Sequence, residues 1–217
     1  TKTGAGSALM RNPEKLYSVV HAVAEAIASR GAAIPITVKI RSGWSHNELT
    51  WQESALAAVE AGAAALTLHP RTCAQCYSGT ADWNILAQLA ALMEGRIPVF
   101  GSGDLFTPEA ARDMLSSTQC AGIMFARGAM GNPFIFQQTK ELLCTGSYHE
   151  ISAATKIKTA KKELDQLCSE VGEQKACREM RKRFAAYTKG IDGGAKLREQ
   201  LVRACSVKDY EIILQAV

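Results

Sequence analysis

The sequence predicts an α/β protein that comprises half of a (β/α)8 barrel, residues 1–145, followed by an all-helical domain, residues 146–217. Two observations support this prediction. Short runs of β-branched residues alternate with amphipathic helices up to about residue 145, and only helical periodicity follows. The strand runs begin near residues 34, 64, 97 and 122, and a repeat of about 30 residues is typical of βα units.

Helix and strand signals mark each βα unit in turn. Asn12 followed by Pro13 is typical of a helix start, and the apolar face behind it ends at Gly31. Thr50 and Glu53 have the spacing of a capping box, which predicts the start of the second helix. The other predicted elements are strands 34–41, 64–69, 97–101 and 122–126, a helix from about Asp82 and a helix capped by Thr107.

The predicted strands are continuous apolar runs, which is typical of strands buried on both faces and predicts a parallel sheet covered by helices. Two architectures fit, a doubly wound open sheet and a (β/α)8 barrel. A barrel uses the carboxyl end of every strand, whereas an open sheet concentrates its site at one switch point. Polar residues here follow all four strands: Lys39, Arg41, His69, Arg71, Gly103, Asp104 and Arg127. The barrel is therefore favoured, and since a whole barrel takes ~250 residues, this part supplies about half of one.

Composition and cysteine pattern restrict the class of protein. Hydrophobic residues make up 47% of the 217 residues, and the longest apolar runs are strand-sized. This excludes a membrane-spanning segment, which needs ~20 apolar residues. Residues 1–7 include neither an initiating Met nor the apolar core of a signal peptide, so no export signal is visible. The seven cysteines are scattered, which favours reduced thiols and a cytoplasmic location.

Two glycine-rich segments, 101–104 and 126–131, follow the last two predicted strands. Glycine lets backbone amides approach an anion closely, and the loops after the final strands of a barrel are common phosphate sites. Tight turns between strand and helix are the alternative explanation for these glycines. Because the two segments are adjacent in the predicted barrel and Arg127 can fork onto a phosphate, we favour phosphate binding.

Lys39 and His69 are candidate ligand contacts. Lys39 lies among apolar neighbours in its strand, so we expect it to be buried, and a buried ammonium needs an ionic partner or a ligand. A salt bridge inside the barrel is the alternative. His69 could be an ordinary core histidine, but its place at a strand end beside Arg71 favours a contact to an anion or a flavin. Cys73 and Cys76 form one CxxC pair without a second pair at zinc spacing, so no metal site is expected.

Positive charge is concentrated in the predicted helical domain. Residues 156–203 contain thirteen Lys and Arg against seven Asp and Glu, although the net charge of the whole chain is only +4. A solvated helix face is the usual explanation for such a run. Between residues 175 and 203 the ratio is nine to three, which favours contact with a phosphate backbone. The candidate contacts are Arg178, Arg181, Lys182 and Lys189.

Eight segments carry a resemblance to a known family. They are GAGSAL at 4–9, VKIRSGW at 38–44, LHPRT at 68–72, YSGTADW at 77–83, GSGD at 101–104, ARGAMGNP at 126–133, MRKRF at 180–184 and YTKG at 187–190. In this order they resemble the C-terminal portion of the bacterial, FMN-dependent tRNA-dihydrouridine synthases, over nearly the whole chain. The resemblance implies strands five to eight of a TIM barrel, followed by a helical tRNA-binding domain.

The resemblance also implies a site and a reaction. Lys39 and His69 would contact the flavin. The phosphate end of FMN would lie against Ser102, Gly103, Asp104, Ala126 and Arg127. The implied reaction reduces the C5–C6 bond of a uridine in tRNA to dihydrouridine, with hydride passing from flavin N5 to C6 after NADPH or NADH has reduced the flavin. The target base would leave the folded tRNA to reach the flavin.

The chain also departs from the family pattern. Ser102 stands where Asn is usual, and Pro70 and Ala126 stand where Gly is usual; the methyl group of Ala126 is expected to weaken FMN binding. No cysteine lies in the family's Gly-Cys-Pro loop, so the proton donor to C5 is expected upstream of Thr1 and this fragment alone is expected to be inactive. A non-catalytic tRNA-binding fragment and a flavin-barrel reductase of a small molecule are the alternatives. Four strands leave two unpaired edges, so self-association is expected.

Overall fold

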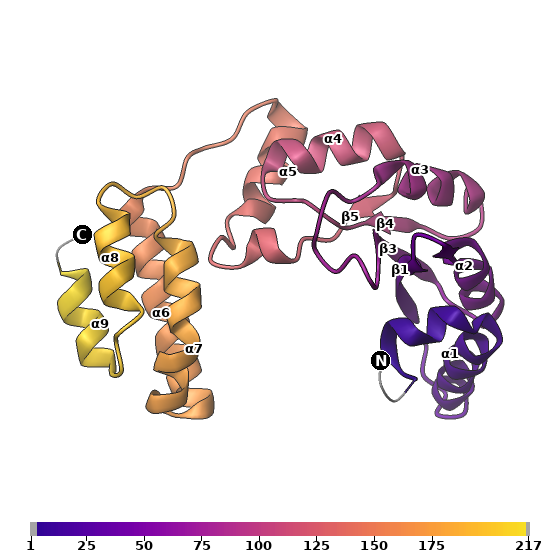
Figure 1. The fold of residues 1–217 in the computed structure, drawn as a ribbon, viewed down its shortest axis with the longest axis horizontal. Helices are drawn as coiled ribbons and strands as arrows, with labels where there is room; N and C mark the ends of the chain where they lie inside the picture. Colours follow the sequence, from indigo (N-terminus) through magenta and orange to yellow (C-terminus); the bar gives the residue numbers. More distant parts are fainter. Residues whose placement is uncertain (1–3, 216–217) are drawn as a thin grey trace. The chain divides into compact units, whose positions relative to one another are not determined.

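The computed structural model describes residues 4–215, and the chain divides into two compact units between Ala126 and Arg127. In the first, which we call the sheet unit, strands and helices alternate (Figure 1). Its elements are η1 (Gly6–Arg11), α1 (Pro13–Ala28), β1 (Thr37–Ser45), β2 (Glu48–Leu49), α2 (Trp51–Glu60), β3 (Ala65–Thr72), α3 (Trp83–Leu92), β4 (Val99–Gly101), α4 (Pro108–Thr118) and β5 (Gly122–Ile123).

The sheet unit contains one five-stranded sheet in the order β2-β1-β3-β4-β5. β1, β3, β4 and β5 run parallel, and each lies beside the next parallel strand along the chain. The predicted α/β fold with a parallel sheet is confirmed. Successive strands of a (β/α)8 barrel are neighbours in this way, whereas the strand order of a doubly wound sheet reverses at a switch point. The observed order therefore favours a segment of a barrel.

Helices pack on only one face of this sheet in the part of the unit that the structure describes (Figure 1). Ile40, Leu66 and Leu68 lie on that face and share one buried core with Leu16 and Leu86 of the helices. Side chains alternate along a strand, so the intervening residues point to the other face. We call it the open face, and it carries Lys39, Arg41, Thr67, His69 and Phe100. Helices on one face only are what a barrel segment requires, because the helices of a barrel form its outer ring.

Several elements end at residues other than those predicted. β1 begins at Thr37 and not at residue 34, since Pro35 has no N–H to add to the sheet. β5 ends at Ile123 and not at residue 126, because the chain leaves the sheet ahead of the short helix η2 (Arg127–Ala129). The side chain of Thr50 makes no capping hydrogen bond, and its Oγ1 is buried without a partner. The predicted capping box at the start of α2 is therefore wrong.

Two other predicted helix caps are confirmed. Asn12 Oδ1 accepts a hydrogen bond from the backbone N–H of Lys15 at 2.9 Å, ahead of α1. Thr107 Oγ1 accepts one from the backbone N–H of Ala110 at 3.1 Å, ahead of α4. Each satisfies a backbone donor that the helix cannot satisfy itself, an effect of about 1 kcal/mol per cap. Both helices cover the apolar side of the sheet unit, so these caps help to fix where they begin.

The sequence analysis missed a short hairpin at the carboxyl end of β1. β1 continues to Ser45, and Gly43 and Ser45 pair with Leu49 and Glu48 of β2 in antiparallel register. A Cβ atom at position 43 would collide with the backbone of Glu48, so this pairing requires glycine there. β2 therefore covers part of the β1 edge that was expected to be unpaired. Self-association through the remaining edges stays a prediction.

The second unit, which we call the helical unit, packs its helices around a separate core. Its elements are η2, α5 (Ile135–Thr145), α6 (Ala153–Val171), α7 (Glu173–Tyr187), α8 (Gly194–Leu201) and α9 (Val207–Leu214). Leu164, Met180 and Leu201 are buried in this core, and Phe184 stacks on Tyr210 with ring centroids 4.6 Å apart. Tyr210 Oη also donates to Cys177 O at 2.8 Å, so the buried hydroxyl is satisfied.

The structural division after Ala126 lies ahead of the predicted domain boundary at residues 145–146. The segment in between contains η2 and α5. The functional assignment of the two predicted domains stays a prediction. No helix within residues 4–215 is long and apolar enough to cross a membrane.

Replacing Gly131 by Ala is expected to destabilise the helical unit. Gly131 has φ +65°, and a Cβ atom there would lie 2.5 Å from Ala186 Cβ of α7. Gly146→Ala is the matched control, because Gly146 has φ +83° but open space around it. We expect the control to lose about 1 kcal/mol from left-handed strain and Gly131→Ala to lose about 1–3 kcal/mol more from the overlap. Urea unfolding measures both, and equal losses would contradict the packing role of Gly131.

Candidate functional site

Residues from three strands meet at the carboxyl end of the open face. Arg41 of β1 is in register with His69 of β3, and Lys39 lies one side-chain repeat earlier on β1. Ser102 follows β4, and its backbone N–H donates to Leu68 O at 3.0 Å, which places Ser102 in the row beside His69. The structure therefore brings Lys39, His69 and Ser102 to one end of one face.

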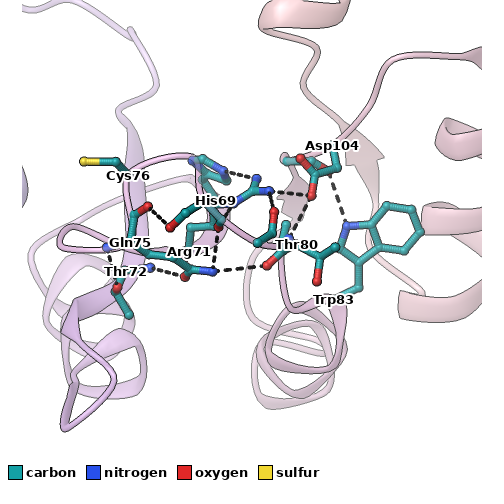
Figure 2. A network of polar contacts seen from close by, with 12 residues as sticks. His69, Arg71, Thr72, Gln75, Cys76, Thr80, Trp83 and Asp104 are labelled. Atoms are coloured by element: carbon teal, nitrogen blue, oxygen red, sulfur yellow. Dashed lines mark hydrogen bonds and ion pairs between the residues drawn. The ribbon is translucent and has the colours of Figure 1, made fainter.

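Arg71 occupies the centre of a polar network at this end of the sheet (Figure 2). Its side chain is only 2% exposed, and Nη2 donates to Asp104 Oδ2 at 2.8 Å and to Gly79 O at 2.7 Å. The same Asp104 oxygen accepts the backbone N–H of Ala81 at 2.8 Å. Asp104 was expected at the flavin phosphate. Its Oδ2 connects its own loop, which follows β4, to the loop that follows β3. Its contact with the cofactor stays a prediction.

The loop between β3 and α3, residues 73–82, is tied down by further hydrogen bonds (Figure 2). Gln75 Nε2 donates to the carbonyls of Ser78 and Thr80 at 3.2 and 3.3 Å. Arg41 Nη1 donates to the carbonyls of Thr72 and Cys76 at 2.9 and 3.3 Å. The loop is therefore anchored to itself and to β1, so it holds a defined position above the ends of the strands.

His69 is neutral at physiological pH. Its side chain is buried at the open face, with Lys39, Arg41 and Arg71 as its charged neighbours. Burial, and then the positive charges of these three residues, lower the pKa of His69 to about 4, and Asp104 only partly opposes them. His69 can therefore exchange hydrogen bonds with a ligand, but it adds no positive charge to the site.

Lys39 is exposed, which corrects the expectation that it is buried. The protein around its stem still removes part of its hydration, and this effect, followed by the charge of Arg41, lowers the pKa of Lys39. Among residues 4–215, neither Lys39 nor Arg41 has an acidic partner within salt-bridge distance, so the alternative of an internal salt bridge is not observed. The open face therefore carries two cations without an acidic partner.

The glycines at 101 and 103 have different roles. A Cβ atom on Gly101 would lie 2.5 Å from side-chain atoms of both Leu86 and Met114, so Gly101 lets two helices approach the sheet, away from the open face. Gly103 has φ +116°, and a Cβ atom there would lie 2.9 Å from His69 Cδ2. Gly103 thus lets its loop reach the histidine. Close packing of helices against the sheet therefore accounts for Gly101, an explanation that the sequence analysis did not consider.

Comparison with known proteins identifies the family. The dihydrouridine synthase family model matches residues 1–217. The chain belongs to the dihydrouridine synthase family. It is 54% identical over 217 residues to a probable tRNA-dihydrouridine synthase of Treponema pallidum, covering 99% of this chain and 64% of that protein. It is 36% identical over 214 residues to a probable tRNA-dihydrouridine synthase 1 of Synechocystis, with 99% and 58% covered. It is 33% identical over 201 residues to tRNA-dihydrouridine synthase B of Xanthomonas campestris, with 92% and 58% covered. The chain thus spans less than two thirds of the length of these relatives.

Ala126 and Arg127 are the remaining predicted flavin contacts of this dihydrouridine synthase family member. Ala126 is exposed and ends the sheet unit, and Arg127 is exposed and begins η2 in the helical unit. Their contact with a phosphate stays a prediction. Cys73 Sγ accepts a hydrogen bond from Ser7 Oγ at 3.2 Å, and the Cys76 thiol donates to Cys73 O at 3.4 Å. No cluster of three metal-ligating side chains occurs within the described part of the chain.

The structure separates the four predicted tRNA contacts into two groups. Arg178 and Lys182 are exposed on α7, and Lys189 is exposed just after it. Arg181 instead turns inward, where Nε donates to Ala204 O at 3.0 Å and Nη2 to Cys205 Sγ at 3.1 Å. Arg181 therefore holds the connection between α8 and α9. The tRNA contact of each residue stays a prediction.

Sequence reasoning noted Arg71 only as a polar residue at a strand end and missed its role as the centre of the network. It also missed Gln75 and the ordered loop around it. A signal was present, because an arginine that continues a wholly buried strand must have its donors satisfied internally. The sequence could not show which acceptors would satisfy it, since Asp104 lies 33 positions further along the chain.

Acidification is expected to destabilise the sheet unit through His69. The pKa of His69 is about 4 in the folded chain and about 6.5 when unfolded, so between these values protons bind preferentially to the unfolded state. The free energy of unfolding should then decrease as the pH falls from 6.5 to 4, by at most about 3 kcal/mol. Urea unfolding of the unaltered protein and of His69→Gln at several pH values isolates this loss. An identical pH dependence in the two proteins would contradict the assignment.

Proposed function

We propose that the protein containing this chain is an FMN-dependent tRNA-dihydrouridine synthase of the cytoplasm, which reduces the C5–C6 bond of uridine in tRNA with NADPH or NADH as reductant. This chain would supply strands five to eight of its TIM barrel and its helical tRNA-binding domain. The observation that carries the proposal is the open face of the sheet. In a chain of this family, it gathers Lys39, Arg41, His69 and Ser102 at the carboxyl ends of successive parallel strands.

The residues of the open face fit FMN by their chemistry. FMN carries a phosphate and a ring system with several carbonyl and nitrogen acceptors, so it needs cations and hydrogen-bond donors. Lys39 and Arg41 are cations with no acidic partner among residues 4–215, and His69 is a neutral group that can donate. Ser102 and Gly103 add a hydroxyl and a close backbone approach. When bound, FMN would supply the hydride for the uridine ring.

The chain's own residues would bind and orient the reactants. Lys39 and His69 would hold the flavin ring, and Ser102, Gly103, Asp104, Ala126 and Arg127 would line its phosphate end. The anchored loop 73–82 would exclude water from this side of the site, because its hydrogen bonds keep it above the strand ends. A uridine in folded RNA must leave its stack to reach such a surface.

The exposed cations of the helical unit would bind the tRNA backbone. Arg178, Lys182 and Lys189 are exposed, and the described structure gives none of them an acidic partner. A phosphate backbone can neutralise all three, with release of its counterions. Arg181 would position this surface indirectly by holding the residues between α8 and α9.

Lys39→Gln is expected to weaken FMN binding by roughly tenfold or more, because it removes a charged hydrogen bond to the ligand. Lys15→Gln is the matched control, since Lys15 is an exposed lysine of α1 and does not belong to the open face. Quenching of flavin fluorescence in the whole protein measures the dissociation constant. The assignment of Lys39 is refuted if both variants bind FMN as tightly as the unaltered protein.

Arg178→Gln/Lys182→Gln/Lys189→Gln is expected to reduce the slope of log affinity for tRNA against log salt by about two to three, since each phosphate contact contributes ~0.7–0.9. Lys158→Gln/Lys161→Gln/Lys162→Gln is the control, because it removes the same charge from exposed positions of α6. We expect a smaller change in the control and an unchanged flavin content in both. Equal slopes in the two triple variants would mean that Arg178, Lys182 and Lys189 act only through the overall charge.

A further inference from the structure

His69 and Arg71 contact each other in a way that determines which ring nitrogen of the histidine carries its proton. Arg71 Nη1 lies 3.5 Å from His69 Nε2. A guanidinium nitrogen can donate a hydrogen bond but cannot accept one. His69 Nε2 must therefore be the acceptor, and in the neutral ring the proton then lies on Nδ1.

Arg71 is held firmly enough to impose this choice. Its Nη2 donates to Asp104 and to Gly79 O, and Nε donates to Ser78 O at 3.4 Å. Its side chain is almost completely buried, so it has no space for another conformation. A proton on His69 Nε2 would oppose the N–H groups of a fixed, buried cation, which is the less favourable arrangement.

The other edge of the His69 ring remains available to a ligand. The backbone of Gly103 lies against the ring edge that contains Cδ2 and Nε2. A Cβ atom added at Gly103 would lie 2.9 and 3.3 Å from these two atoms, so a ligand has no room there. Nδ1 is on the opposite edge, and within residues 4–215 it has no hydrogen-bond partner. Nδ1 is not among the fully buried side-chain atoms without a partner in the described residues, so it is accessible to solvent or to a ligand. The arrangement suits a ligand that accepts a hydrogen bond.

We propose that Arg71 is a positioning residue that fixes His69 as the Nδ1–H tautomer, so that His69 offers a neutral hydrogen-bond donor to a carbonyl oxygen or unprotonated ring nitrogen of its ligand. That this ligand is FMN rests on the proposed function. His69 then differs from Lys39 and Arg41 in its task. The two cations attract negative charge anywhere nearby, whereas a fixed N–H selects an acceptor atom in one direction.

The tautomer can be measured directly by long-range ¹⁵N–¹H correlation in histidine-labelled protein, with His69→Gln to assign the signal among the four histidines. At pH 7 we expect the His69 proton on Nδ1. In Arg71→Met, which removes the donor but keeps an unbranched apolar stem, we expect the proton to move to Nε2, the tautomer that free histidine prefers. Asp104→Asn is the control, because it weakens the ion pair and leaves the Arg71–His69 contact, so we expect Nδ1–H to persist.

The unaltered protein alone can overturn the proposal, whether or not Arg71→Met folds. A His69 proton on Nε2, or a doubly protonated ring at pH 7, contradicts it. If Arg71→Met folds and keeps the proton on Nδ1, Arg71 does not fix the tautomer, and this part of the proposal fails.

Titration with FMN separates this proposal from the proposed function. We expect FMN to move the Nδ1 resonance of His69 and His69→Ala to lose about tenfold in affinity for FMN. FMN binding that leaves the Nδ1 resonance unmoved overturns the donor role of His69 and leaves the proposed function intact. No FMN binding by the whole protein overturns the proposed function, while Nδ1–H in the unaltered protein still supports the tautomer.

Discussion

A buried guanidinium must have its donors satisfied, and Arg71 meets this requirement with acceptors from separate parts of the chain. The carboxylate of Asp104 comes from the loop after β4, and the carbonyls of Ser78 and Gly79 come from the loop after β3. Removal of one partner from such a buried pair typically costs about 3–5 kcal/mol, because an uncompensated charge remains. The positions of both loops, and of His69 beside them, therefore depend on the Arg71 side chain.

The alternation of side chains along β1 and β3 connects stability with function in the sheet unit. Ile40 and Leu68 face the helices and contribute to the core, while their neighbours Arg41 and His69 point to the open face. The strands are parallel and in register. Ile40 therefore pairs with Leu68 in the core, and the next pair, Arg41 and His69, lies side by side on the open face. Packing of the helices thus also sets the spacing of the candidate ligand contacts.

The helical unit divides its cations in a comparable way. Arg183 forms an ion pair with Glu163, and Arg198 donates to Thr188 O at 3.0 Å. With Arg181, these side chains hold segments of the unit together, so they are not free to follow a flexible polyanion. Most of the cations that extend into solvent are lysines, with a few arginines such as Arg178, and their hydration is exchanged for phosphate at little structural cost. Net charge alone therefore overstates the surface that can bind RNA.

The sequence by itself determined the parallel α/β fold, the helical part and most helix starts, because these follow from local periodicity and caps such as Asn12 and Thr107. It also placed His69 and Ser102 near the ends of their strands and Lys39 within its strand, since strand signals are local. Only the tertiary structure decided that Lys39 is exposed, that Arg181 turns inward and that Arg71 pairs with Asp104. Each of these depends on which atoms from distant parts of the chain surround a side chain. The periodicity of the sequence describes only neighbours along the chain, so it does not show which distant atoms these are.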